Sequence, residues 1–266
     1  MSSEAISEKS YLAEDWLNRV RLPKTDPSVP QDAEWCEIQE QGSWKRLRFH
    51  DYAEIYARPG LYEHLFYGLL QCRSPERVVG LLEATRKENQ APREFTALDL
   101  GAGNGLVGEA LRGAGASRVA GVDILPEAHA ATERDRPWVY ADYLVADLCA
   151  PTPEVSERLG KLRPEVLTCV AALGFGDIPP LAYYHAASFV PVGGMLAFNI
   201  KEEFLDERYT YGFSELVRQM VREKVVRLEA TMRYRHRLSA AGQPLFYNAM
   251  VATKLAEIPR SMLVAP

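Results

Sequence analysis

The sequence contains few cysteines, and their arrangement argues against a metal-binding or disulfide-rich module. Four cysteines occur among 266 residues, and none belongs to a CxxC pair or has histidines at metal-ligand spacing. We therefore expect no metal site. The first residues, Met1-Ser-Ser-Glu-Ala, also lack the charged and then apolar pattern of a secretory leader. These two absences predict a cytoplasmic protein with reduced thiols.

Long apolar runs and an excess of basic residues are missing as well. The longest apolar stretch, 166–200, is interrupted by Asp177 and three prolines, so it predicts no membrane span. Lysine and arginine total 31 against 36 acidic residues, which gives a net charge of -5. Since nucleic-acid enzymes usually carry a basic face, we expect no nucleic-acid partner. The length allows one large or two small domains, and 47% hydrophobic residues suffice for a buried core.

The most informative feature that is present is a glycine-rich turn between a short apolar strand and a helix. Residues 97–111 read ALDLGAGNGLVGEAL, with alternate glycines at Gly101, Gly103 and Gly105. Glycine lets the backbone turn sharply and lets a ligand approach the main chain closely. The N–H groups that open the helix attract a negatively charged group. This pattern predicts a nucleotide-like ligand.

Proteins that bind dinucleotides use a similar turn, and the register of the glycines argues against them here. Their GxGxxG fingerprint appears at 103–108, but Gly101 has already ended the strand before it begins. Counting from Gly101 instead puts Leu106 where the third glycine is expected. Asp99, two residues before the turn, would repel a pyrophosphate but suits a ligand with an ammonium group, such as S-adenosylmethionine.

Two further acidic residues follow at regular intervals, each at the end of an apolar run. Asp123 lies 24 residues after Asp99, and Asp147 lies a further 24 residues on. A strand, a helix and two loops fill about this length in a βαβ fold, so the three carboxylates should meet at one edge of a parallel sheet. Each acid alone would be an ordinary solvated loop residue, whereas three at this spacing indicate a ligand site.

At these residues the chain resembles class I S-adenosylmethionine-dependent methyltransferases, and the resemblance covers roughly 95–255. It implies an α/β, Rossmann-like fold with a mostly parallel seven-stranded sheet, a C-terminal antiparallel hairpin and an N-terminal lid or extension. It also implies a methyltransferase with S-adenosyl-L-methionine as its cofactor. The domains expected from it are an extension over 1–94 and a cofactor-binding domain over 95–258.

The resemblance also assigns cofactor-binding residues. The turn would hold the methionine part of the cofactor, Asp123 would accept hydrogen bonds from both ribose hydroxyls, and Asp147 with Leu148 would meet the adenine amino edge. The full expected set is Tyr56, Asp99, Gly101, Gly103, Asn104, Gly105, Asp123, Ile124, Asp147, Leu148 and Ala171.

The remaining core elements follow from hydrophobic periodicity. After Asp147 the pattern predicts strands over 166–172 and 193–200, helices over 181–189 and 211–223, and a hairpin from 225–238 and 245–254. A terminal hairpin agrees with the resemblance and disfavours most dinucleotide dehydrogenases. Nearer the N-terminus, the sequence predicts a small hairpin from 34–39 and 44–49 and an amphipathic helix over 75–87.

An aromatic-rich segment begins at His50. In the small-molecule methyltransferases that the chain resembles, such a segment caps the cofactor and shapes the acceptor pocket. Tyr52 and Tyr56 resemble their Tyr-x-x-x-Tyr lid. Core packing is the alternative role for each of these aromatic residues.

The acceptor is expected to be a small organic molecule, methylated at oxygen, nitrogen or sulfur. Residues 172–180 lack the Asn/Asp-Pro-Pro-aromatic signature of enzymes that methylate planar amino groups in nucleic acid or protein. A hydroxyl or thiol acceptor also needs a base, and the candidates are His64, His185 and His236. Each histidine is otherwise a surface or packing residue.

Other residues near the expected acceptor are less specific. Asn199 and residues 201–203 follow the fifth predicted strand and are candidates for contact with the acceptor, and 204–213 is a candidate flap. Two further functions remain open. One is a non-catalytic methyltransferase-like protein that binds the cofactor as a sensor or assembly partner. The other is a nicotinamide-dependent oxidoreductase. The sequence predicts no oligomeric state.

Overall fold

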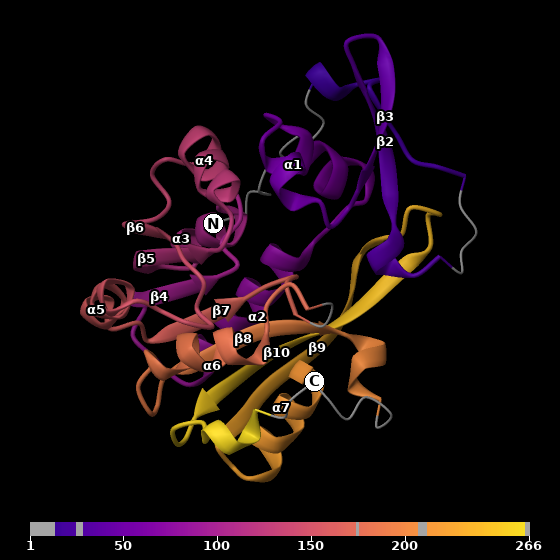
Figure 1. Ribbon diagram of the computed structural model, residues 1–266. Helices are drawn as coiled ribbons and strands as arrows, with labels where there is room; N and C mark the ends of the chain where they lie inside the picture. The colour runs from indigo at the N-terminus through magenta and orange to yellow at the C-terminus, as the bar shows by residue number, and fades with distance from the viewer. Residues whose placement is uncertain (1–13, 25–28, 174–175, 207–211, 264–266) are drawn as a thin grey trace, which may run out of the picture. The chain divides into compact units, whose positions relative to one another are not determined.

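The computed structural model describes residues 14–24, 29–173, 176–206 and 212–263, and the chain forms two compact units (Figure 1). Unit 1 comprises residues 1–73 and 236–245, and unit 2 comprises residues 74–235 and 246–266. The division expected at 94 and 95 stays a prediction, because compactness alone does not define an independently folding domain.

Unit 1 contains a small antiparallel sheet in the order β1-β2-β3. The turn between β2 and β3 consists of Gln41 and Gly42, which both have positive φ (49° and 78°). Two residues with this backbone form the tight turn that matches the twist of a hairpin, so the predicted N-terminal hairpin is confirmed. The elements are η1 (Glu14–Trp16), β1 (Val20–Arg21), η2 (Gln31–Ala33), β2 (Trp35–Glu40), β3 (Ser43–Arg48), α1 (Tyr52–Tyr56) and the π-helix η3 (Glu63–Leu69).

A buried ion pair ties the tip of the C-terminal hairpin to the residue before β2 within unit 1. The guanidinium of Arg237 donates to Glu34 across 2.6 Å, and both side chains are almost fully buried. The other oxygen of Glu34 accepts the main-chain N–H of Ala240 at 2.5 Å. Removing one partner of such a pair leaves an uncompensated buried charge, so these contacts fix where the hairpin tip lies in unit 1.

Unit 2 is built on a seven-stranded sheet in the order β6-β5-β4-β7-β8-β10-β9. The first five strands of this order are parallel, and β10 is antiparallel to β8. This confirms the predicted mostly parallel sheet that ends in an antiparallel hairpin. The strands are β4 (Phe95–Leu100), β5 (Ala116–Asp123), β6 (Asp142–Val145), β7 (Val166–Cys169), β8 (Met195–Lys201), β9 (Val226–Leu238) and β10 (Pro244–Lys254), whose hairpin tip lies in unit 1.

Helices cover both faces of this sheet. Proline occupies the first turn of α4, α5 and α6, where its missing N–H costs no helical hydrogen bond, and the Thr152 side chain caps α5. The helices are α2 (Ser74–Glu88), α3 (Leu106–Gly113), α4 (Pro126–Asp135), α5 (Pro153–Leu162), α6 (Pro180–Ser188), α7 (Gly212–Arg222) and the short η4 (Glu202–Leu205) and η5 (Arg260–Met262). Among the described residues, no helix combines the length and the apolar character needed to cross a bilayer.

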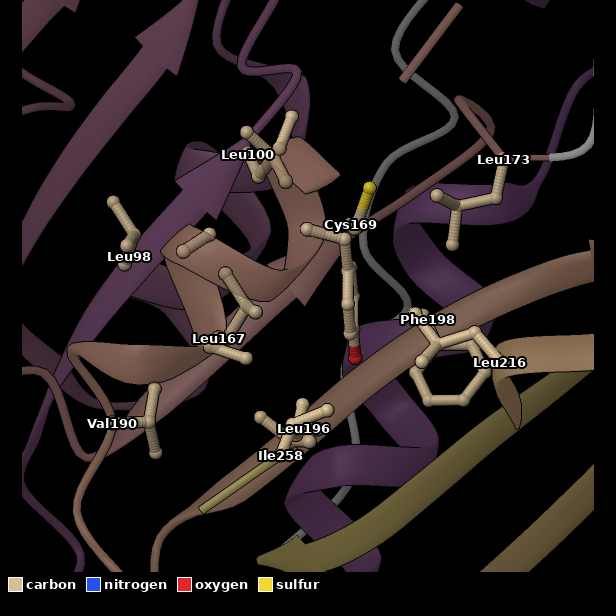
Figure 2. Close-up of a cluster of buried hydrophobic side chains, with 14 of the residues drawn as sticks. Leu98, Leu100, Leu167, Cys169, Leu173, Val190, Leu196, Phe198, Leu216 and Ile258 are labelled. Atoms are coloured by element: carbon tan, nitrogen blue, oxygen red, sulfur yellow. The ribbon is translucent and has the colours of Figure 1, made fainter. Parts of the chain in front are cut away.

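Side chains alternate between two buried clusters along each central strand. Leu98 and Leu100 join the cluster under α6 and α7, which Figure 2 shows with Leu167, Phe198 and Leu216. Ala97 joins the opposite cluster, under α2 and α3. Because side chains on a strand alternate, Asp99 also points to the α2 and α3 face. An ionisable group is thereby placed in an otherwise apolar layer.

Helix α3 lies close to Tyr140 because residue 108 is glycine. A Cβ at Gly108 would lie 2.6 Å from the Tyr140 ring, and one at Gly121 in β5 would lie 3.1 Å from it. The ring of Tyr140 therefore fills the space that side chains at these two positions would need. Both glycines serve packing rather than backbone conformation.

The variant Gly108→Ala tests this packing. We expect the added methyl group to lower the free energy of unfolding by about 1–3 kcal/mol, as overpacking does. Gly80→Ala is the matched control, because Gly80 lies inside α2 with no atom within 4 Å of its Cβ position. Removing this helical glycine should raise the free energy of unfolding by about 1 kcal/mol. Urea denaturation of both variants provides the measurement, and equal effects at both positions would contradict the packing role.

Candidate functional site

The glycine turn follows β4 directly, at the carboxyl edge of the sheet in unit 2. Gly101 and Gly105 have φ values of 75° and 88°, which side chains disfavour. Their surroundings are also crowded, since a Cβ at Gly101 would lie 2.9 Å from Ile178 and one at Gly105 would lie 3.1 Å from Val139. Backbone conformation and space both require glycine at these positions.

The Asp123 carboxylate binds the turn directly. Its Oδ2 accepts the N–H of Gly103 at 2.9 Å, and its Oδ1 accepts the N–H of Leu125 at 3.0 Å. The N–H of Gly101 donates to the carbonyl of Val122 at 2.8 Å, which anchors the turn on β5 just before Asp123. The second acid and the glycine turn are thus one structural unit.

Asp123 keeps the capacity to bind further donors. A carboxylate has about four acceptor positions, and the main-chain N–H groups of Gly103, Leu125 and Ile124 act on this one. Burial raises the pKa of Asp123, and the main-chain N–H groups oppose that rise. The next residue, Ile124, is an apolar side chain that is 59% exposed. A half-buried acceptor beside an exposed apolar side chain suits a polar sugar joined to a flat apolar ring.

Asp147 follows β6 at the same edge of the sheet, as the 24-residue spacing predicted. The N–H of Ala146 donates to the Asp123 carbonyl at 2.9 Å, so the two acids lie on adjoining segments. Asp147 is exposed, and its Oδ1 accepts the N–H of Cys149 at 2.7 Å. The side chain of Leu148 packs in the core. Whether these residues hold adenine stays a prediction.

Asp99 was expected to face the ammonium group of a ligand, but its side chain is fully buried. One carboxylate oxygen accepts the Tyr140 hydroxyl at 2.7 Å, and the other accepts the Thr168 hydroxyl at 2.7 Å. Burial raises the pKa of Asp99 to about 7, the two hydroxyls oppose this rise, and the charge of Asp123 adds to it. Asp99 therefore lies beneath the turn as a supporting group, without an exposed surface of its own.

Two hydroxyl groups that the sequence analysis missed donate to the turn, and a third lies beside it. Thr132 and Tyr143 donate to the Gly103 carbonyl at 2.7 and 2.9 Å. The Tyr140 oxygen lies 3.4 Å from the Ala102 carbonyl. In the sequence, Gly108 and Gly121 could have indicated a large side chain packed beside the turn. Their positions do not identify that side chain as Tyr140.

Asn104 belongs to a polar cluster at the start of α3. Its side chain is buried, and its amide nitrogen lies 3.5 Å from Asp135. Arg136 donates to the Asn104 carbonyl at 3.3 Å and pairs with Glu109 at 2.8 Å. These contacts hold the end of the turn against α4.

Ala171 lies just after β7 and adopts an unusual left-handed backbone conformation, with φ of 59°. Its N–H donates to Oδ1 of Asn199 at 2.6 Å. The Asn199 amide nitrogen bonds the Tyr234 hydroxyl at 2.6 Å and the Ser74 hydroxyl at 3.2 Å, and the two hydroxyls lie 2.7 Å apart. Asn199 is fully buried inside β8, so its expected contact with the acceptor is replaced by a role in holding Ala171.

The three candidate bases occupy different surroundings. In unit 2, Nδ1 of His185 lies 2.6 Å from the Leu148 carbonyl and therefore carries a proton that it donates. In unit 1, His236 is buried beside the Cys72 thiol, and burial lowers its pKa well below the usual value. His64, also in unit 1, is 2% exposed, and burial lowers its pKa too. A catalytic role for any of them stays a prediction.

Tyr56 packs in an aromatic cluster of unit 1. Its ring centroid lies 4.7 Å from Tyr62 and 6.2 Å from Tyr52, and Phe66 contacts both of these neighbours. Core packing therefore accounts for these rings within unit 1, and a lid function of Tyr56 stays a prediction. The expected flap over 204–213 falls partly outside the described residues, since 207–211 are not described.

Metal ligands do not gather anywhere in the described parts of the chain, where no group of three or more His, Cys, Asp or Glu side chains is arranged for an ion. The four cysteines are free thiols. The partners of Asp99, Asp123 and Asp147 at the sheet edge are hydroxyl and main-chain N–H groups.

Comparison with known proteins identifies the fold. No family model matches the sequence, and no curated protein matches it. A putative RNA methyltransferase from Pyrococcus horikoshii aligns with a TM-score of 0.50 at 14% identity, over 70% of this chain and 88% of that one. The chain has the class I methyltransferase fold.

Two further solved structures give similar values. A S-adenosylmethionine-dependent methyltransferase from Clostridium acetobutylicum has a TM-score of 0.49 at 11% identity, over 74% of this chain and 96% of that one. Magnesium protoporphyrin IX methyltransferase from Synechocystis, solved with bound S-adenosylmethionine, has a TM-score of 0.49 at 14% identity. The alignment covers 76% of this chain and 94% of that one. At such identities the likeness concerns the fold, and the activities in those names belong to those proteins.

The network around Asn199 yields a stability prediction. Asn199→Leu, which keeps the branched shape of the side chain, leaves the partly buried Ala171 N–H without its acceptor. We expect the free energy of unfolding to fall by about 1–3 kcal/mol. Tyr234→Phe is the milder companion at about 0.5–1.5 kcal/mol, because Asn199 keeps Ser74 as a partner. Urea denaturation measures both, and a larger loss for Tyr234→Phe would refute the central place of Asn199.

The raised pKa of Asp99 predicts a pH dependence of stability. The folded-state pKa of about 7 exceeds the unfolded value of about 3.9, so the stabilising contribution of Asp99 is complete below about pH 4 and is lost as pH rises through 7. In the variant Asp99→Asn the side chain cannot ionise, so its contribution to stability does not fall as pH rises. Relative to the natural protein, the variant should therefore gain free energy of unfolding between pH 5 and pH 8. Urea denaturation at both pH values tests this, and a constant difference would count against a raised pKa.

Proposed function

We propose that this protein is an S-adenosylmethionine-dependent methyltransferase that transfers a methyl group to a small organic acceptor. The observation that carries the proposal is the Asp123 carboxylate bound to Gly103 of the glycine turn, with the exposed Ile124 beside it. Asp123 suits a nucleoside with free ribose hydroxyls, and Asp99 beneath the turn disfavours a pyrophosphate and suits a ligand with an ammonium group.

The residues at the sheet edge fit this cofactor in character. The two ribose hydroxyls would donate to the oxygens of Asp123, which accept main-chain N–H groups of the turn and of the segment after β5. Ile124 would cover one face of the adenine, and Asp147 would accept from its amino group. The glycine turn would face the methionine part, with Asp99 supplying negative charge beneath it.

The cofactor, when bound, supplies a methyl group made electrophilic by its sulfonium. The task of the protein is then to hold an acceptor atom in line with that methyl group and to keep water away. Alignment of this kind lowers a barrier by about 7–11 kcal/mol. The Asn199 network serves this task by fixing the main chain at Ala171, after β7.

The candidate bases His64, His185 and His236 differ in protonation and in their contacts. Burial lowers the pKa of His64, so its imidazole is neutral near pH 7, which is the form that accepts a proton. Among the described residues, its Nδ1 has no hydrogen-bond partner. His185 donates its Nδ1 proton to the Leu148 carbonyl, and His236 packs against Cys72, so both already serve structural contacts.

A small acceptor is favoured by charge and by sequence. The net charge of -5 disfavours a nucleic-acid substrate, and residues 172–180 lack the signature of enzymes that methylate planar amino groups. The RNA substrate in the name of the Pyrococcus protein belongs to that protein. Turnover assays with hydroxyl, amine and thiol acceptors, measured as S-adenosylhomocysteine formed, test the acceptor class.

Calorimetric titration with S-adenosylmethionine and S-adenosylhomocysteine tests the cofactor. We expect binding that Asp123→Asn weakens at least tenfold, because the amide offers fewer acceptor positions to the ribose. Asp32→Asn in unit 1 is the control, since Asp32 is exposed and should leave the affinity unchanged. Absence of binding at millimolar concentration rejects the proposal.

The two other functions separate in the same experiments. Binding of the cofactor without turnover of any acceptor would favour a sensor or assembly protein. Thermal stabilisation by NAD or NADP, without stabilisation by S-adenosylhomocysteine, would favour an oxidoreductase.

A further inference from the structure

Among the described residues, Tyr140 is the one tyrosine whose hydroxyl bonds to Asp99. Its hydroxyl lies 2.7 Å from Oδ2 of Asp99 and 3.4 Å from the Ala102 carbonyl. A phenol has a single proton, so the shorter contact with the carboxylate takes it. The ring is held between Gly108 and Gly121, which fixes where the hydroxyl points.

This placement gives Tyr140 an effect on the glycine turn that Asp99 alone would not have. Asp99 lies in an apolar layer, where an isolated charge is disfavoured. A hydrogen bond donated to the charged form stabilises that form. The hydroxyls of Tyr140 and Thr168 are the two side-chain donors that do this.

We propose that Tyr140 is a positioning residue that, by donating its hydroxyl proton to Asp99, keeps negative charge beneath the glycine turn for a cationic ligand. This inference rests on the proposed cofactor, whose ammonium group is the cation in question. Asp99 would attract it through the turn, without direct contact.

The other ionisable groups near Asp99 set the background for this effect. Asp123 on β5 opposes the charge of Asp99, and burial keeps the phenols of Tyr140 and Tyr143 neutral by raising their pKa values. Burial likewise raises the pKa of the Cys169 thiol on β7. Both phenols and the thiol are therefore neutral near pH 7, where Asp99 changes its charge.

Tyr140→Phe is the test, since it keeps the ring between the two glycines and removes only the hydroxyl. Loss of one hydrogen bond to a charged group should raise the titration midpoint of Asp99 by about one pH unit. Carboxyl carbon NMR of protein labelled at aspartate measures this midpoint without any ligand, and Asp99→Asn assigns the signal.

Affinity for S-adenosylhomocysteine, which carries the same ammonium group, gives the second reading. At pH 7 a midpoint near 8 leaves about a tenth of Asp99 charged, against about half in the natural protein. We expect about fivefold weaker binding at pH 7 for Tyr140→Phe and a smaller difference at pH 8.5. Calorimetry over pH 6–8.5 measures both.

Tyr143→Phe is the matched control, because this neighbouring phenol donates to the Gly103 carbonyl instead of a carboxylate. It should leave the Asp99 midpoint in place and lower the affinity equally at every pH. Thr168→Val removes the other donor to Asp99 and should act like Tyr140→Phe, which keeps the inference testable should Tyr140→Phe not fold.

The outcomes are distinct. A raised Asp99 midpoint with a matching shift in the affinity profile supports the inference. An unmoved midpoint, or a loss of affinity that is the same at all pH values, overturns it. If the midpoint moves but the natural protein does not bind S-adenosylhomocysteine, the proposed function fails, and the ligand named in this inference fails with it.

Discussion

The hydrogen bond between the Asp123 carboxylate and the N–H of Gly103 is the interaction on which the site depends. It joins the end of β5 to the turn that follows β4, and the main-chain bond from Gly101 to Val122 holds the same junction. Because parallel strands bring their carboxyl ends to one edge, segments far apart in sequence meet there. The geometry of the turn therefore depends on the register between β4 and β5.

The second constraint is the burial of polar groups on the α2 and α3 face of the sheet. Asp99 on β4 pairs in register with Thr168 on β7, Asn199 on β8 lies two residues after the register partner of Thr168, and all three are fully buried. Such groups destabilise a fold unless each finds a partner, and here each does. Asp99 and Thr168 bond to each other, and the hydroxyls of Tyr140 and Tyr234 are further partners of Asp99 and Asn199.

Much of the fold followed from local patterns. The alternating runs at the C-terminus predicted the antiparallel hairpin, and the spacing of Asp99, Asp123 and Asp147 predicted one parallel edge, because both signals depend only on strand geometry. The setting of Asp99 did not follow. A carboxylate at the end of a strand suggests contact with a ligand, but burial depends on which face the strand turns inward and on Tyr140, 41 residues away.

The sequence by itself determined the order of the strands of the large sheet along the chain, the glycine turn and the edge on which the acids lie, since periodicity and spacing are properties of the chain. Only the tertiary structure decided which polar groups support that edge. Asn199 holds Ala171 and Tyr140 holds Asp99 because strands distant in sequence pack side by side. Hydrogen bonds of this kind leave no local pattern, since either partner alone is compatible with many surroundings.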